Sequence, residues 1–155
     1  MDRPAAPLPL IRPATTADAP QIAHVHRESR RATMPYLPPQ RRDHAAVTRW
    51  ARETLFTTCT TWVATRGPDL IGYAAVRDDL LEHLYVRPDA LRTGTGGLLL
   101  DAARTHRPDG LTLHVFARNT AARAFYARHG FTVVATGDGS STMEGLPELT
   151  LGWTP

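Results

Sequence analysis

The sequence contains no lysine: all 18 of its lysine or arginine positions are arginines. A P-loop places a lysine on the bound phosphates, and a pyridoxal enzyme forms its Schiff base on one, so both enzyme classes are excluded. A GC-rich genome, which favours arginine codons, is the simplest account of this bias. The arginines are scattered along the chain. A nucleic-acid binder would need them clustered beside exposed stacking aromatics, whereas a net charge of +3 also suits a pocket for an anionic cofactor.

Cysteine is nearly absent as well. The single Cys59 excludes an internal disulfide and a cysteine zinc cluster, and a reducing cytoplasm fits best. No apolar run approaches the roughly 18 residues of a membrane helix, so no membrane partner is expected. The proline-rich start lacks the apolar core of a signal peptide. We therefore expect a flexible tail over residues 1–8 and a single domain over residues 9–155.

Seven histidines are present, but their pattern predicts no metal site. His24 and His26 are two residues apart, so they cannot share one face of a helix as paired ligands. His114 stands among apolar residues of an expected strand, which predicts a side chain packed in the core.

The hydrophobic periodicity predicts an α/β domain with a mixed sheet and helices on its faces. A threonine at 15 and an aspartate at 18 predict a capping box at the start of the first helix. The middle β-α-β crossover should be parallel and right-handed. The expected strands are 9–13, 60–66, 70–76, 80–86, 111–116, 131–136 and 149–153, and the expected helices are 17–30, 41–56, 96–106 and 119–129.

A turn poor in side chains lies within LYVRPDALRTGTGGLLL, residues 84–100, between an expected strand and an expected helix. The first N–H groups of a helix have no partners, and small residues let an anion approach them. Two interpretations stay open here: a plain tight turn, or a phosphate cradle. A Rossmann loop is excluded, because its third glycine would fall at Leu99.

A second motif separates these interpretations. Together the two segments resemble the GCN5-related N-acetyltransferases (GNAT), a large acetyl-CoA-dependent family. The first motif is a hydrophobic-Pro-acid step followed by a Gly-x-Gly loop, here Val86, Pro88, Asp89, Gly94 and Gly96. The second is Asn-x-x-Ala-x-x-x-Tyr-x-x-x-Gly-Phe, here Asn119, Ala122, Tyr126, Gly130 and Phe131. In one respect the chain departs from the family: Leu91 stands where glutamine or arginine is usual, which removes one polar contact.

The resemblance implies a GNAT fold: a mostly antiparallel sheet of six or seven strands with a central splayed parallel pair, flanked by about four helices. It implies acetyl-CoA as co-substrate and no metal. The backbone of the strand before the loop would pair with the pantetheine arm, and one of its N–H groups would polarise the thioester carbonyl. The implied cofactor-binding residues are Leu84, Tyr85, Val86, Arg92, Thr93, Gly94, Thr95, Gly96, Gly97, Leu98, Asn119 and Tyr126.

The resemblance makes Tyr126 the general acid that protonates the departing thiolate, which is feasible because a phenol and a thiol have similar pKa values. A tyrosine packed in the core is the alternative. Glu82 is the candidate base: strand alternation places it on the same face as Leu84, with His83 on the other. Its alternative is a solvated carboxylate.

The first two helices and the late loop should build the acceptor side, with Tyr36, Trp50 and Glu144 as candidate contacts. The implied function is direct transfer of an acetyl group to a primary amine of a small molecule or peptide. The alternative is an inactive acetyl-CoA sensor, which only Leu91 favours. Dimers are common in the family, which leaves a homodimer open.

Overall fold

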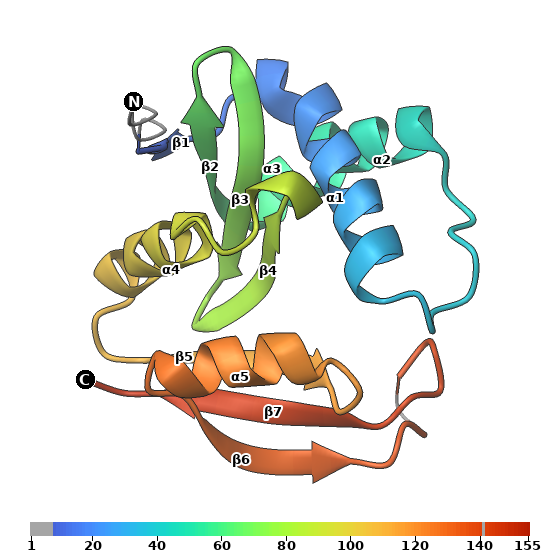
Figure 1. Cartoon of the computed structure of the whole chain (residues 1–155), viewed down its shortest axis with the longest axis vertical. Coiled ribbons are helices and arrows are strands. Elements are labelled where there is room, and N and C mark those ends of the chain that lie inside the picture. The colour runs from blue at the N-terminus through green and yellow to red at the C-terminus, as the bar shows by residue number, and fades with distance from the viewer. Residues whose placement is uncertain (1–7, 141) are drawn as a thin grey trace, which may run out of the picture.

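The computed structural model describes residues 8–140 and 142–155, so most of the tail expected over residues 1–8 lies outside the described residues. One seven-stranded sheet runs through the molecule in the order β1-β2-β3-β4-β5-β7-β6 (Figure 1). The strands are β1 Leu10–Pro13, β2 Thr60–Arg66, β3 Asp69–Arg77, β4 Leu80–Val86, β5 Leu111–Phe116, β6 Thr132–Gly137 and β7 Glu148–Trp153. The helices are α1 Ala19–Thr33, α2 His44–Trp50, α3 Phe56–Thr58, α4 Thr95–His106 and α5 Thr120–Arg128.

Two hydrophobic clusters pack against the sheet. Helices α4 and α5 belong to the first, which contains the fully buried Leu99 and Leu100 together with Tyr126. Helix α1 belongs to the second, which contains Ile22 and Tyr73. Burial of one such leucine or isoleucine side chain contributes about 1.5–3 kcal/mol, so each helix is held by its apolar face, as the periodicity predicted.

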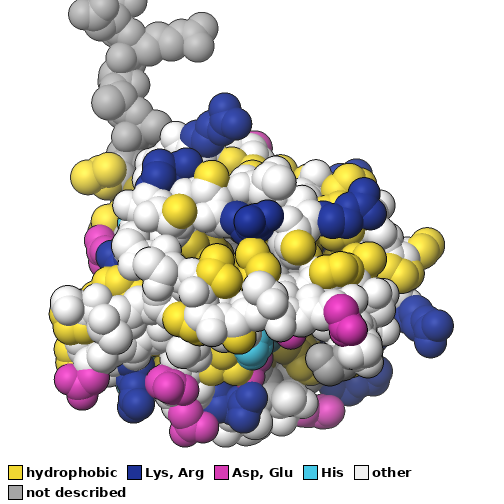
Figure 2. All heavy atoms as spheres, turned by 90° about the horizontal axis from the view of Figure 1, so that it is seen from below, with side chains coloured by type: hydrophobic (Ala, Val, Ile, Leu, Met, Phe, Trp, Pro, Cys, Tyr) yellow, Lys and Arg dark blue, Asp and Glu magenta, His cyan; other side chains and the backbone are white. Residues whose placement is uncertain are grey.

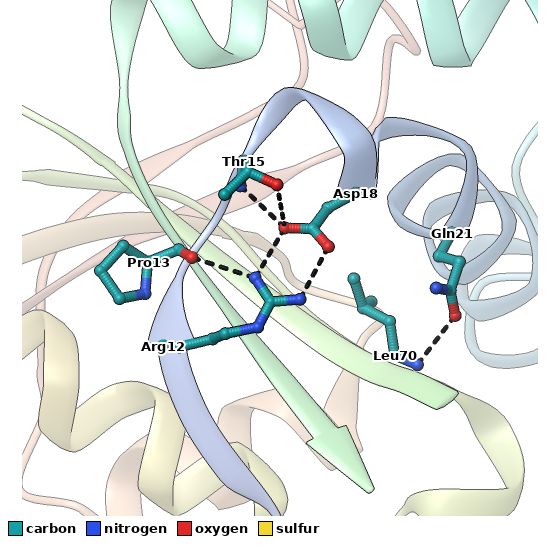
Figure 3. Close-up of polar contacts among 6 residues, drawn as sticks. All are labelled: Arg12, Pro13, Thr15, Asp18, Gln21 and Leu70. Atoms are coloured by element: carbon teal, nitrogen blue, oxygen red, sulfur yellow. Dashed lines mark hydrogen bonds and ion pairs between the residues drawn. The ribbon is translucent and has the colours of Figure 1, made fainter. Parts of the chain in front are cut away.

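The start of α1 is fixed by a buried carboxylate (Figure 3). Asp18 accepts hydrogen bonds from both terminal nitrogens of Arg12, each at 2.8 Å, and from the Thr15 backbone N–H at 2.7 Å. The guanidinium of Arg12 is the main reason that the pKa of Asp18 lies below its usual value. One turn later the Gln21 side chain accepts from the Leu70 N–H, which ties α1 to β3. The predicted capping contact therefore also joins the helix to the edge strand β1.

The helix predicted over residues 41–56 is shorter and irregular. Helix α2 begins at His44, after Asp43 accepts a hydrogen bond from the Ala46 N–H, and a π-helical turn, η2 Ala51–Leu55, follows it. The apolar stripe of Val47, Trp50 and Leu55 predicts one continuous helix, because a π turn also buries its apolar residues, here Ala51 and Leu55, and so does not break the pattern.

The sheet is divided between β4 and β5. All other neighbouring strands among the described residues pair in antiparallel fashion, and their registers run along most of their lengths. The parallel pair β4–β5 has one register position, Leu80 opposite Thr112, beside a hydrogen bond from the Thr112 N–H to the Asp79 carbonyl. Beyond it the two strands separate (Figure 1). The predicted mixed sheet with a splayed parallel pair is confirmed.

Strand β6 forms the edge of the sheet opposite β1, at the bottom of Figure 1. Figure 2 views the molecule from this side, where hydrophobic side chains lie among arginines and carboxylates. Val133 and Val134 are 54% and 59% exposed. The β6 edge therefore presents apolar side chains to solvent.

Candidate active site

The glycine turn leads into α4 with its backbone donors free. Gly94 has a left-handed backbone (φ 87°), and the first intrahelical bond runs from the Leu98 N–H to the Gly94 carbonyl. Residues 92–97, all of them described, donate no backbone hydrogen bond to protein. Six successive N–H groups at a positive helix end are a site for an anion.

The surroundings of this loop fit a phosphate. A Cβ added at Gly94 would meet no atom within 4 Å, so the approach to the N–H groups is open. Thr93 and Thr95 hydroxyls lie 2.8 Å apart, and Arg92 is exposed beside them. At Gly96 an added Cβ would come within 3.3 Å of the Phe125 ring, so this glycine lets α4 and α5 approach each other.

A cleft of about 130 Å³ follows the separation between β4 and β5. It passes through the sheet: Tyr126 and Asn119 line it from the α5 side, whereas Met34 at the end of α1 and Phe116 line it from the other. Leu84 and Tyr85 of β4 form one wall. The structure thus brings the strand, the α5 motif and the acceptor side together at one opening.

Tyr126 is 8% exposed and lies between the rings of Phe125 and Phe131. Burial, and secondarily Tyr85, raises the pKa of its phenol, so the hydroxyl keeps its proton near neutral pH. No described protein group makes a hydrogen bond to this hydroxyl. Asn119 caps α5 by accepting a hydrogen bond from the Ala122 N–H at 3.2 Å. The phenol is therefore a neutral donor at the wall of the cleft.

Glu82 also lines the cleft, but in an irregular part of β4. His83 pairs with Ala75 and Leu81 with Val76, so Glu82 has no partner residue on β3. This bulge interrupts the alternation on which its shared face with Leu84 was predicted. One oxygen of its carboxylate lies 2.8 Å from Nε and 2.6 Å from Nη2 of Arg77.

The backbone of β4 faces in two directions. The Arg87 N–H donates to the Ile71 carbonyl of β3 at 2.7 Å. The backbone N–H and C=O groups alternate in direction along a paired strand. Those of Tyr85 therefore point toward β3, whereas those of Leu84 and Val86 point toward the gap between β4 and β5. Two of the three residues predicted to pair with a pantetheine arm thus direct their backbone groups away from β3, and Leu84 of these two lines the cleft.

Two of the three predicted acceptor contacts, Tyr36 and Glu144, lie near residues that line the cleft. Tyr36 packs edge-on against Phe116, with the Arg118 guanidinium 4.6 Å from the centre of its ring. Glu144 lies 3.8 Å from Arg30, whose other terminal nitrogen donates to the Tyr85 hydroxyl. Tyr36 therefore touches a residue that lines the cleft, and Glu144 approaches one through Arg30.

Trp50 lies deeper, in a cluster of aromatic rings beneath α1. Its ring is 5.3 Å from those of His26 and His83. The buried Tyr73 hydroxyl is 2.7 Å from His26 Nδ1. Burial lowers the pKa of His26 to about 3 and that of His83 to about 4, so both rings are neutral at physiological pH.

His114 was predicted to pack in the core, and this prediction was wrong. Its side chain is 49% exposed and lines the cleft beside Glu148. The apolar neighbours Leu113 and Val115 are buried as predicted, but alternation places His114 on the other face. The signal that could have found it is this alternation, combined with the family's splayed pair.

The described residues form a second hollow, away from the cleft. A hollow of about 270 Å³ lies outside α5, between Arg123 and Val133, and none of the predicted site residues lines it. Among all the residues that the structure describes, no group of three or more histidine, cysteine or acidic side chains is placed to hold a metal ion. None of the helices in the described part is long and apolar enough to cross a bilayer.

Comparison with known proteins decides the family. A model of the "Acetyltransferase (GNAT) domain" matches residues 57–133, about half of the chain. The chain belongs to the GNAT family. This confirms the resemblance drawn from the two motifs, both of which lie within the matched residues. Of the two GNAT motifs, the tyrosine motif lines the cleft through Asn119, Ala122 and Tyr126, and the loop follows β4, the strand that forms one wall.

Individual GNAT relatives extend the match. Peptidyl-lysine N-acetyltransferase YjaB of Salmonella typhimurium is 32% identical over 91 residues, 58% of this chain and 62% of the relative. Peptidyl-lysine N-acetyltransferase YiaC of Escherichia coli is 26% identical over 146 residues, 93% of this chain and 96% of that protein. The structure of yncA from Salmonella typhimurium with acetyl-CoA superposes with a TM-score of 0.72 at 21% identity, covering 96% of this chain and 94% of that one.

Proposed function

We propose that this protein transfers the acetyl group of acetyl-CoA directly to the side-chain amine of a lysine in a peptide or protein. The observation that carries the proposal is the cleft through the sheet, which is lined by a neutral buried phenol and by Leu84 and Tyr85 of β4. Strand β4 leads directly into the loop with six free N–H groups. Acetyl-CoA supplies an activated thioester. The GNAT relatives named for peptidyl-lysine support the choice of acceptor.

The loop and β4 have distinct parts in binding. The N–H groups of residues 92–97, with Arg92, would hold the diphosphate of coenzyme A, and Leu98 and Asn119 would border it. The free backbone groups of Leu84 and Val86 would orient the pantetheine arm and the thioester carbonyl. An exposed Leu91, 45% accessible, offers no polar contact at the loop.

Tyr126 would donate its proton to the departing thiolate. A raised pKa keeps the phenol protonated before the reaction, so that its O–H can stabilise the negative charge as it develops on sulfur. The same burial disfavours a charged thiolate, which favours transfer of the proton to sulfur. Glu82 stays the base predicted from the sequence, although accepting a proton would compete with its contacts to Arg77. A cytoplasmic location and a homodimer also stay predictions, the second of which sedimentation at several protein concentrations would check.

The test uses Tyr126→Phe, which removes only the hydroxyl. We expect turnover in a thiol-release assay to fall by about 100-fold, with acetyl-CoA affinity by calorimetry unchanged. The acceptor would be an N-terminally blocked peptide with a single lysine, and the control the same peptide with arginine in its place. Unchanged turnover would remove Tyr126 from the chemistry. Acetyl-CoA binding without thiol release to any amine would favour the sensor instead.

A further inference from the structure

The cleft has an imidazole on the face opposite Tyr126. Along β5 the side chains of Leu113 and Val115 are buried in the same cluster as Tyr126, whereas His114 points to the acceptor side. Both Tyr126 and His114 line the one cleft. A thioester held in this gap would have a proton donor on one side and an imidazole on the side from which an amine arrives.

Two oxygens of β7 orient the His114 ring. Nδ1 lies 3.0 Å from the Thr150 hydroxyl oxygen and 3.9 Å from a carboxylate oxygen of Glu148. Thr150 is the register partner of His114, and Glu148 pairs with Phe116 next to it. The Glu148 carboxylate can only accept, so we assign the hydrogen to Nδ1. The lone pair is then on Nε2, which has no partner among the described residues.

His114 makes fewer contacts with charged protein groups than Glu82, the base predicted from the sequence. Glu82 is bonded by two nitrogens of Arg77. His83 is nearby, but its ring is packed among the aromatic side chains of the cluster beneath α1. Histidine is also the side chain used most often for proton transfer near neutral pH.

We propose that the His114 imidazole accepts, directly or through one water, the proton that the acceptor amine loses, with Glu148 and Thr150 as positioning residues. This inference rests on the proposed function. The amine nitrogen forms a bond to the acetyl carbon and the carbon–sulfur bond breaks. The sulfur leaves with the bonding electrons and takes the Tyr126 proton, while the amine proton goes to His114. Glu148 stabilises the imidazolium that forms.

The experiment compares His114→Gln, His114→Ala and Glu82→Gln in the thiol-release assay with the single-lysine peptide. We expect His114→Gln to lower kcat by about 100-fold or more, with acetyl-CoA affinity by calorimetry unchanged. Added imidazole should restore part of the turnover of His114→Ala, because it can enter the vacated space and accept the proton. Glu148→Gln should give a smaller loss, and His24→Gln, on the exposed face of α1, is the matched control.

The outcomes separate this inference from the proposed function. No thiol release by the unaltered protein would refute the proposed function, and the inference with it. Activity in the unaltered protein that His114→Gln leaves intact, or that only Glu82→Gln abolishes, would refute the inference alone. A loss in His114→Ala that imidazole does not restore would also refute it, because a purely structural defect is not rescued by a free base.

Discussion

Acidification from pH 8 to pH 5 should weaken the fold through the two buried histidines beneath α1. In the unfolded chain both rings titrate near the ordinary pKa of 6.5, whereas in the folded protein the pKa values are about 3 for His26 and about 4 for His83. Between these values the unfolded state binds more protons. The free energy of unfolding therefore falls as the pH drops below 6.5, and the loss is complete only below the folded pKa values.

The magnitude follows from the distance between pH 5 and 6.5. One pKa unit corresponds to about 1.4 kcal/mol. Each histidine that stays neutral in the folded protein at pH 5 therefore lowers the free energy of unfolding by about 2 kcal/mol relative to pH 8. Both together cost about 4 kcal/mol, a large part of the roughly 5–15 kcal/mol by which domains are stable. His26→Gln should remove about half of this pH dependence, whatever it does to stability at pH 8.

Urea unfolding at pH 8, 7, 6 and 5 measures this difference. His24→Gln, two residues earlier on the exposed face of α1, is the control and should keep the parent slope. The same loss between pH 8 and pH 5 in the parent and in His26→Gln would refute the reasoning. If His26→Gln is too unstable to titrate, because it disturbs the bond to Tyr73, His83→Gln tests the same point.

Substitutions at three further positions test other parts of the structure. Gly96→Asp should abolish acetyl-CoA binding in calorimetry, because it adds a negative charge next to the anion site and a side chain against the Phe125 ring, whereas Gly96→Ala adds the same Cβ without charge and should retain measurable binding. Asp18→Asn should lower the free energy of unfolding in urea by about 1–3 kcal/mol, since it weakens the bonds from Arg12; no loss would show that the contact is unimportant. Gly72→Ala should cost about 1–3 kcal/mol, because its Cβ would lie 3.0 Å from the Tyr85 carbonyl oxygen, and an unchanged thermal midpoint would contradict this.

Much of the fold could be predicted because its signals are local. The apolar stripe of α4, the cap at Asn119 and the left-handed Gly130, with φ 87°, all follow from residues close together in the chain. The splayed pair came only from the family resemblance. Nothing in the residues of β4 or β5 alone shows that the two strands pair at Leu80 and then part.

The site was predictable where one segment suffices and not where two strands must be compared. Tyr126 could be named from a motif within a single helix. Glu82 was placed by alternation, which a bulge interrupts, and a bulge depends on the pairing with β3. His114 was misplaced because an apolar run shows that faces alternate but not which face lies open. Which face is open depends on the point at which β4 separates from β5, and the residues of β5 alone do not specify that point.

The single paired position between β4 and β5 has a consequence for how the protein responds to ligands. Backbone hydrogen bonds between β4 and β5 stop after this one position. Strands β1 to β4 are therefore held against strands β5 to β7 chiefly by side-chain packing. A ligand bound in the gap between β4 and β5 would contact both groups of strands and stabilise their arrangement. At a free ligand concentration of a thousand times the dissociation constant, binding would add about 4 kcal/mol to the free energy of unfolding. The melting temperature therefore reports directly which ligands this protein binds.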